Sequence, residues 1–562
     1  MGLGIVPKYS NLFPGEKIPD LSTLLKDVPS SMSIGILSFI NGSLFLEDTI
    51  KAQLFFVAKL LERSPKTSVE SFQGSLRKFA KDNELEYFNI FPLFTMLRFI
   101  EWEINNYRDI DFIESTPEQE IAVLKAILIF NEELDRQYGE IKPKKIPQEL
   151  IWPVGLPQFE FSTRTWFLSG FLSSLDLCDY LKQRYPEQYK EYLTFYDVEK
   201  IETIFVKVFE LFINGHKKET RSYFSHFKTE VLEKNKILKS FNHALSALNA
   251  EEYKKEGNDK HFKGMRKWPI VSYGKGFFDI VNWNFLSDKL STTAIGFDFY
   301  YNTSMKDTVK FDQYKADLGL NFSETIQFNK YIELSFPGKT HIRITPDENR
   351  NLNVDHYVRN ENHICLFEFK DYIMPDKVKN GSYEEIKSYF DTRFIANEKG
   401  KKKGISQLAT QIESLSRSLQ LYEDFKKLGI HKHRMSIFPI IVVTDYSFMI
   451  SGLEHYLDIE FKKLLPKKHG FYQIHNLTII ELDFFQEYHE ILNNGIESLP
   501  SLIHRHYLTL ETTRSLFRRG NTPGLNVKTM FSFRHTTYPK LKYTDPTKES
   551  DFQAIVKRLG IK

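Results

Sequence analysis

The segment HICLFEFKDY, residues 363–372, has the composition of a buried β-strand but carries an acid and a base near its end. Side chains alternate along a strand, so Glu368 and Lys370 point to the same face. Apolar side chains precede them on that face, and Phe367 and Phe369 lie on the other. Burying a carboxylate and an ammonium group is costly unless the two are paired or used. This strand end is therefore the first candidate for a functional site.

The elements around this strand predict a mixed β-sheet with helices on its faces. Helical apolar periodicity marks the helices, and short β-branched or aromatic runs mark the strands. In chain order we expect a helix over 312–334, strands over 341–344, 353–358 and 363–370, a helix over 404–429, a strand over 436–445, a helix over about 450–464, a strand over 477–482 and a helix over 483–494. Binding sites in such sheets lie at the carboxyl ends of the strands, where Glu368 and Lys370 are expected.

Asp355 lies 13 residues before Glu368, and the residues at 360–362 have the composition of a turn between the two strands. If these strands pair, Asp355 lies beside Glu368. Two adjacent carboxylates repel each other unless a proton or a cation sits between them. Oxygen ligands with room for water suit Mg²⁺ or Mn²⁺, and Lys370 could then hold a phosphate oxygen or a polarised water. Such a site suits phosphodiester hydrolysis.

Asp355 followed by Glu368-x-Lys370 at a strand end resembles the PD-(D/E)XK nuclease superfamily, which has the restriction-endonuclease-like fold. The resemblance covers roughly residues 311–490 and implies metal-dependent cleavage of nucleic acid, in the first place DNA. It implies that Asp355, Glu368 and the backbone carbonyl of Phe369 hold Mg²⁺ or Mn²⁺. One departure is that Asn353-Val354, with no proline, precedes the aspartate.

The same resemblance assigns roles to two further residues. Glu324 stands where the family has an acid on its first core helix, and it would assist the metal or its water shell. Gln407, one turn before Gln411, lies on the helix after the Glu-x-Lys strand and would orient water or phosphate. The block 262–310 resembles large bacterial phage-defence and restriction proteins, which implies a role in antiviral defence or restriction. Cleavage of both DNA strands implies a homodimer or a higher assembly.

Three other interpretations stay open. Lys370 could form only a structural ion pair with the neighbouring acids. The chain could keep the fold without catalysis and bind nucleic acid or a regulatory partner. It could also be an RNA-directed nuclease or toxin. Calorimetry with Mg²⁺ or Mn²⁺ separates the second interpretation from catalysis, and competition between DNA and RNA tests the third.

Pattern changes divide the 562 residues into four expected segments. The first is mainly helical and would sense or dock a partner or activator protein. The others are a small β-containing connector, the nuclease-like domain and a basic extension. The expected boundaries are 1–261, 262–310, 311–495 and 496–562. The prolines at 143, 147, 153 and 157 indicate a connector inside the first segment, and AIGFDFYY at 294–301 reads as a strand.

Charge is uneven along the chain, although its net value is only +3. Residues 501–562 hold twelve Lys and Arg against four Asp and Glu, which favours a polyanionic partner. Residues expected to contact the nucleic-acid backbone are Lys399, Lys401, Lys402, Lys403, Arg518 and Arg519. His504-x-His506 reads as a surface pair rather than as two metal ligands.

Two cysteines, the absence of a secretory leader and the absence of an apolar run of 18 residues predict a cytoplasmic protein without membrane spans.

Overall fold

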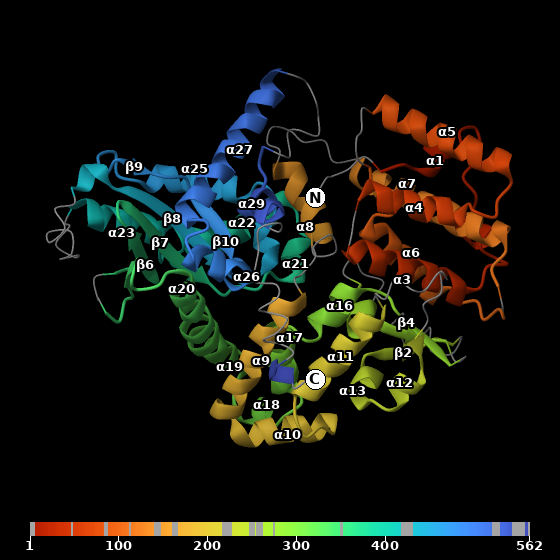
Figure 1. The fold of residues 1–562 in the computed structure, drawn as a ribbon, viewed down its shortest axis with the longest axis horizontal. Coiled ribbons are helices and arrows are strands. Elements are labelled where there is room, and N and C mark those ends of the chain that lie inside the picture. Colours follow the sequence, from red (N-terminus) through yellow and green to blue (C-terminus); the bar gives the residue numbers. More distant parts are fainter. Residues whose placement is uncertain are drawn as a thin grey trace. The chain divides into compact units, whose positions relative to one another are not determined.

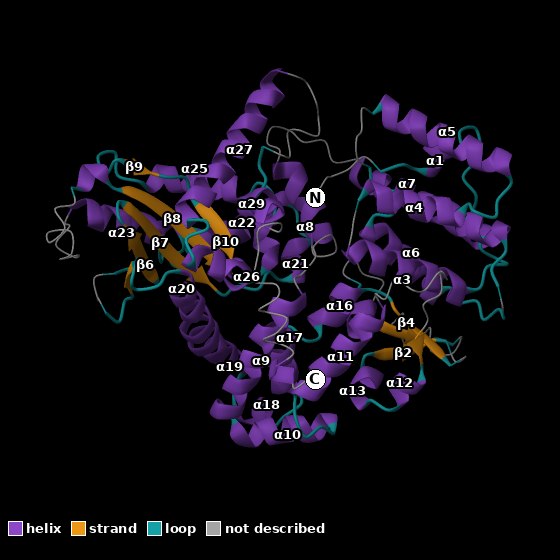
Figure 2. Cartoon of the chain, in the orientation of Figure 1, coloured by secondary structure: helices purple, strands orange, loops and turns teal. Residues whose placement is uncertain are grey.

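The computed structural model describes residues 6–46, 49–83, 88–111, 114–139, 148–159, 167–215, 227–246, 253, 262–273, 276–348, 352–417, 431–519, 529–541 and 557–559. The chain forms two compact units. Unit 1 comprises residues 1–142, 161–308 and 558–562, and unit 2 comprises 143–160 and 309–557. Both contain helices and one mixed sheet (Figures 1 and 2). The mixed α/β class expected from the sequence is therefore present, with helices dominating the N-terminal half.

Unit 1 is a helical body with a small sheet. Its core is built mainly on α3, α6 and α7, and its strands run in the order β1-β4-β3-β2. The elements are α1 (Tyr9–Leu12), α2 (Leu21–Leu24), α3 (Ser30–Leu46), α4 (Ile50–Leu60), α5 (Lys66–Asp82), α6 (Leu93–Asn105), α7 (Pro117–Gly139), α9 (Phe167–Arg184), α10 (Pro186–Tyr196), α11 (Glu202–Gly215), β1 (Phe227–Lys228), α12 (Glu230–Glu233), α13 (Lys236–Ser240), β2 (Asn242–Ala244), α15 (Lys263–Lys267), β3 (Ile270–Ser272), β4 (Phe277–Ile280), α16 (Trp283–Asp288), α17 (Thr292–Tyr301) and α18 (Met305–Thr308).

Unit 2 is a sheet with helices on both faces. Its strands run in the order β10-β8-β7-β6-β5, with β9 paired to β8. The elements are α8 (Gln148–Phe159), α19 (Phe311–Asp317), the π-helix η1 (Leu318–Phe328), α20 (Asn329–Ser335), β5 (Ile342–Ile344), β6 (His356–Asn360), β7 (His363–Lys370), α21 (Asp376–Lys379), α22 (Tyr383–Phe394), α23 (Ile405–Arg417), η3 (Lys432–Arg434), β8 (Ser436–Val443), η4 (Tyr446–Met449), α25 (Leu453–Leu464), β9 (Gln473–Ile474), β10 (Thr478–Glu481), α26 (Leu482–Asn493), α27 (Leu499–Arg519) and α29 (Phe533–Leu541).

Alternation along β7 divides the interior of unit 2 into two cores. Ile364 and Leu366 belong to the core that α8, α22, α23 and α25 cover. Cys365, Phe367 and Phe369 belong to the core that α20, α26, α27 and α29 cover. The strand is therefore apolar on both faces, as its composition predicts, because it is sandwiched between helical layers.

The pairing in this sheet is mixed. β7 pairs with β8 in parallel and with β6 in antiparallel orientation, and β10 continues the parallel half beyond β8. The five expected strands of this sheet are all present, within three residues of the expected ends. The helix expected over 404–429 is described as far as Arg417, and its remainder lies outside the described residues.

Two predictions of secondary structure are wrong. Residues 294–301 lie in helix α17, because Ser291 caps the helix by accepting the Ala294 N–H at 3.2 Å. The proline-rich connector contains helix α8, which holds Pro153 and Pro157. Trp152 anchors this helix in unit 2: it is fully buried, and its indole N–H donates to the Ser451 carbonyl at 3.2 Å.

The compact units do not follow the four segments expected from the sequence. Residues 143–160, from the expected first segment, belong to unit 2. The strands β3 and β4 of the expected connector share a sheet with β1 and β2, which precede residue 262. The boundary at 309 falls close to the predicted start of the nuclease-like domain at 311.

Candidate active site

The carboxyl end of β7 places Glu368 and Lys370 on one face of the sheet. Glu368 is fully buried, and the Lys370 side chain is 11% exposed. The Lys370 ammonium donates to Glu368 Oε1. The other carboxylate oxygen, Glu368 Oε2, is buried and has no hydrogen-bond partner within the described part of the chain. Protein groups therefore form a hydrogen bond with only one of the two carboxylate oxygens of Glu368. A buried oxygen without a hydrogen bond destabilises the folded protein.

Asp355 lies opposite Glu368, immediately before β6. The β6–β7 register pairs His356 with Phe367, and extending it by one residue brings Asp355 across from Glu368. The Asp355 N–H donates to the Phe367 carbonyl at 3.0 Å, which continues the ladder. In return, Asp355 Oδ2 accepts the Phe369 N–H at 2.5 Å. This bond fixes the aspartate carboxylate at the end of the strand that carries Glu368.

Glu324 reaches the same place from the π-helix η1, on which it is partly buried. A π-helix of 11 residues is unusual, and π-helical turns are found mostly at functional positions. Gly319 of this helix lies close to the strand end, because a Cβ there would stand 3.2 Å from Asp371 Oδ2. The widened helix thus brings an additional acid toward the pair.

Burial raises the pKa of all three acids, and neighbouring charges add to or oppose this shift. Burial, with repulsion from Asp355 and only partial compensation by Lys370, raises the pKa of Glu368 to about 8. Burial and Asp355 raise the pKa of Glu324 to about 7. Burial also raises the pKa of Asp355, against Lys370 and the Phe369 N–H. For Lys370, burial favours the neutral amine, but Glu368 and Asp355 outweigh it and raise the pKa.

The donor set fits a hard divalent cation in part. Asp355 and Glu368 supply carboxylate oxygens from neighbouring strands, and Glu368 Oε2 lacks a partner that a cation could supply. Among the residues that the structure describes, however, no three His, Cys, Asp or Glu side chains stand close enough together to enclose a metal ion. Waters and a backbone carbonyl such as that of Phe369 would have to complete the ligand set, as Mg²⁺ commonly permits.

Gln407 is not brought to the acids. Its Oε1 accepts the Gly404 N–H at 3.0 Å and so caps the start of α23. Gln411, one turn later, is fully buried and accepts the Asn353 N–H at 2.7 Å. This glutamine therefore supports the segment that leads to Asp355. The sequence offered both glutamines, but only tertiary structure distinguishes the capping residue from the supporting one.

The expected nucleic-acid contacts differ in their surroundings. Lys403 lies within electrostatic reach of Lys370 and Glu368, whereas Lys402 donates to Thr410 Oγ1 at 2.9 Å. Lys399 and Lys401 are exposed. Arg518 and Arg519 end helix α27, and their side chains lie outside the described residues.

His506 is buried rather than exposed, in contrast to the surface pair expected at His504-x-His506. Its two ring nitrogens contact Glu454 Oε1 and Thr536 Oγ1, each at 2.6 Å. Glu454 Oε2 in turn accepts the Ile479 N–H at 2.9 Å. The network ties α27 to α25, α29 and β10. It is a structural arrangement, since each named polar atom has a protein partner.

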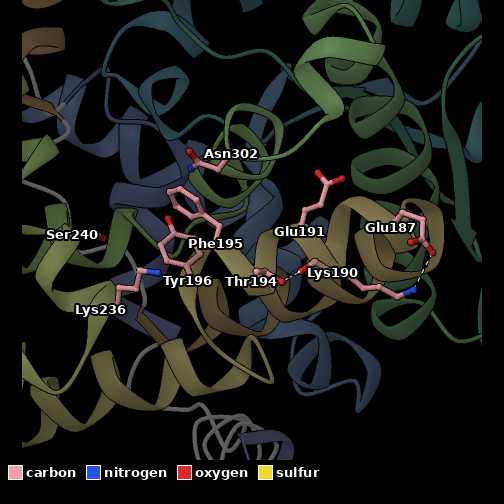
Figure 3. Close-up of a pocket in the computed structure, with 9 residues that line it drawn as sticks. All are labelled: Glu187, Lys190, Glu191, Thr194, Phe195, Tyr196, Lys236, Ser240 and Asn302. Carbon is pink, nitrogen blue, oxygen red and sulfur yellow. Dashed lines mark hydrogen bonds and ion pairs between the residues drawn. The ribbon is translucent and has the colours of Figure 1, made fainter.

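A cavity of about 730 Å³ lies in unit 1, between α10, α13 and the end of α17 (Figure 3). Most of its polar groups are occupied: Glu187 pairs with Lys190 at 3.0 Å, and Glu191 accepts the Ser304 N–H at 2.6 Å. The exposed Phe195 ring forms part of its wall. Its acids and bases are exposed to solvent, unlike the buried acids and base at the end of β7.

Comparisons with protein families, curated proteins and solved structures give no match to this chain. The described helices include none that is both long and apolar enough to cross a membrane.

Proposed function

We propose that the protein is a Mg²⁺- or Mn²⁺-dependent nuclease that hydrolyses phosphodiester bonds, with DNA as the first candidate substrate. The observation that carries the proposal is the meeting of Asp355, Glu368 and Lys370 at one strand end, where the buried Glu368 Oε2 has no hydrogen-bond partner among the described residues. This arrangement supports the resemblance to the PD-(D/E)XK nucleases. In this proposal Asp355, Glu368 and the Phe369 carbonyl hold the cation.

The cation, when bound, activates water and neutralises the charge that develops on the phosphate. Side chains of the protein bind the phosphate and accept the proton. Glu368 would help to hold the cation, and the Lys370 ammonium, freed from Glu368, would hold a non-bridging phosphate oxygen. Glu324, whose pKa is about 7, can accept the proton of the attacking water at its carboxylate near neutral pH. The apolar layers on both faces limit access of bulk water to the strand end.

Plasmid cleavage with Mn²⁺ or Mg²⁺ tests the proposal. The wild type should cleave, Lys370→Ala and Glu368→Gln should lose activity by at least a hundredfold, and EDTA should abolish it. Lys387→Ala and Glu413→Gln are matched controls, because these residues form surface pairs with Asp391 and Arg417. Equal cleavage by wild type and Lys370→Ala would remove the assignment. Parallel incubation with RNA decides between the DNA and RNA forms of the proposal.

A second candidate is a protein that keeps the fold and binds nucleic acid or a regulatory partner without cleavage. The direct Lys370–Glu368 pair favours it, because a charge-neutral pair needs no cation. Calorimetry distinguishes the two: the nuclease binds Mn²⁺ through Asp355 and Glu368, and the silent protein does not.

The cellular setting is proposed by analogy with the family. We place the protein in the cytoplasm of a bacterium, in antiviral defence or restriction, with unit 1 receiving a partner or activator. A homodimer would supply two sites for the two strands of a duplex. Sedimentation of the purified chain with and without duplex DNA tests the assembly.

A further inference from the structure

Several cations near the acidic pair have no carboxylate partner within the described chain. They include Arg393 at the end of α22, and Lys401 and Lys403 in the turn before α23. The other basic side chains of α22 and α23 are paired. Lys387 contacts Asp391 at 2.6 Å, and Arg417 contacts Glu413. The uncompensated charge is therefore found on the side of the helices that faces the strand end.

Arg393 is held in place by two aromatic rings rather than by an acid. Its guanidinium carbon lies 5.0 Å from the centre of the Tyr372 ring and 5.3 Å from that of Tyr389. The Tyr389 hydroxyl donates to the Ile373 carbonyl at 3.1 Å, and its ring stacks nearly parallel on Phe448. Tyr372 is two residues beyond Lys370. The rings, together with a hydrogen bond to Tyr389, thus fix an exposed guanidinium near the strand end and leave its remaining donors available to a ligand.

The turn between α22 and α23 brings Lys403 to the same place. The Lys403 N–H donates to the Ile395 carbonyl at 2.9 Å, so the chain returns to the end of α22. Gly404 permits this close approach: its φ is +41°, and a Cβ there would stand 2.9 Å from the Phe394 carbonyl oxygen. The Lys403 ammonium is coupled electrostatically to Lys370, Lys401 and Arg393, and Glu368 offsets only part of their repulsion. Placing several like charges around one acid costs stability, and a polyanion would offset that cost.

We propose that Arg393 and Lys403 form a phosphate clamp, which binds the nucleic-acid backbone beside the phosphate that Glu368 and Lys370 act on. The proposal rests on the proposed function and deepens it. A planar guanidinium presents paired N–H donors that match two phosphate oxygens, and an ammonium adds a point charge. Because the two aromatic rings already orient Arg393, binding loses less side-chain entropy than it would with a free arginine.

Binding in EDTA tests the clamp separately from cleavage. Fluorescence anisotropy with a labelled duplex, over a range of salt concentrations, gives the affinity and its salt slope. Arg393→Ala should weaken binding about tenfold or more and lower the slope by about 1, the value for one lost phosphate contact. Arg393→Lys should keep the slope and lose part of the affinity. Arg417→Ala, which removes an arginine paired with Glu413, is the matched control and should change neither.

Each outcome is decisive. Unchanged affinity and slope in both Arg393→Ala and Lys403→Ala, or no binding of duplex by the wild type, overturns the clamp. If Arg393→Ala instead abolishes capture of a glutamate-rich peptide and leaves duplex binding intact, the cations serve an acidic protein and the clamp is wrong. If the wild type binds duplex through Arg393 but never cleaves it with Mn²⁺, the clamp stands and the nuclease fails. Hydrogen exchange of the α22 peptides checks that the variants are folded.

Discussion

Replacing Lys370 by Met is expected to destabilise unit 2 much more than replacing Glu368 by Gln. Among the described residues, Lys370 is the cation that donates to Glu368, and its charge also opposes the raised pKa of Asp355 and Glu324. Without it, three acids remain together at the strand end. Without the Glu368 charge, by contrast, Lys370 still has Asp355 as a neighbour, and repulsion among the acids falls.

The magnitude follows from burial. Glu368 is fully buried and the Lys370 side chain is 11% exposed, so little solvent screens the pair. Removing one partner of a buried pair costs about 3–5 kcal/mol when the other charge is left alone. In EDTA at pH 9, we expect Lys370→Met to lower the free energy of unfolding by about 3 kcal/mol or more. We expect Glu368→Gln to lower it by less than about 1.5 kcal/mol.

The pH dependence has a defined sign. The pKa of Glu368 is raised in the folded protein, to about 8 from an ordinary value of 4.5. Its contribution to stability is therefore fully present below pH 4.5 and is lost as pH rises through 8. The Lys370→Met penalty should be largest at pH 9 and should shrink as the carboxyls take up protons. Mn²⁺ at 100 times its Kd should raise the free energy of unfolding of any variant that binds it by about 2.7 kcal/mol.

Urea unfolding followed by hydrogen exchange of the β7 and β8 peptides measures these differences in unit 2 itself. A Lys370→Met variant that is as stable as Glu368→Gln at pH 9 would refute the reasoning. It would mean that the acids are not close enough to require a common cation.

Three further predictions concern groups that hold the site in place. Burial, with a contribution from Arg343, lowers the pKa of His356 to about 4, so it is neutral when folded. Because the unfolded chain takes up this proton first, the free energy of unfolding should fall by about 3 kcal/mol as pH falls from 6.5 to 4. Urea titrations should show a smaller decrease of the free energy of unfolding in His356→Gln. Gln411→Leu should lower the free energy of unfolding by about 1 kcal/mol and slow plasmid cleavage. Gln407→Ala should lower the free energy of unfolding by a similar amount without slowing cleavage. Gly404→Ala should lower stability by about 1–3 kcal/mol in thermal unfolding, because its φ is +41°; an unchanged melting temperature contradicts the turn geometry.

The sequence predicted the sheet of unit 2 well because its signals are local. β7 extends from His363 to Lys370, as its composition indicates, and its two faces divide between two cores. A turn at residues 360–362 and the spacing of the two acids were enough to place Asp355 across from Glu368. Strand alternation and hairpin register are properties of short segments, so they can be read without tertiary information.

Other features depend on contacts between distant segments and were missed. His506 is buried by Glu454 and Thr536, from helices that the sequence does not show to be neighbours. Helix α8 packs in unit 2 through Trp152, although its prolines predicted a connector. The π-helical geometry around Glu324 has no recognised sequence pattern, and Arg393 stood in a polar stretch that gave no sign of its two tyrosines.

The most direct test of the central claim is a crystal of the protein soaked in Mn²⁺ and measured at the manganese absorption edge. The account predicts an anomalous peak about 2.0–2.3 Å from carboxylate oxygens of both Asp355 and Glu368, with the Lys370 ammonium released from Glu368. A Lys370–Glu368 pair that remains closed, with no peak between the two acids at saturating Mn²⁺, would contradict it.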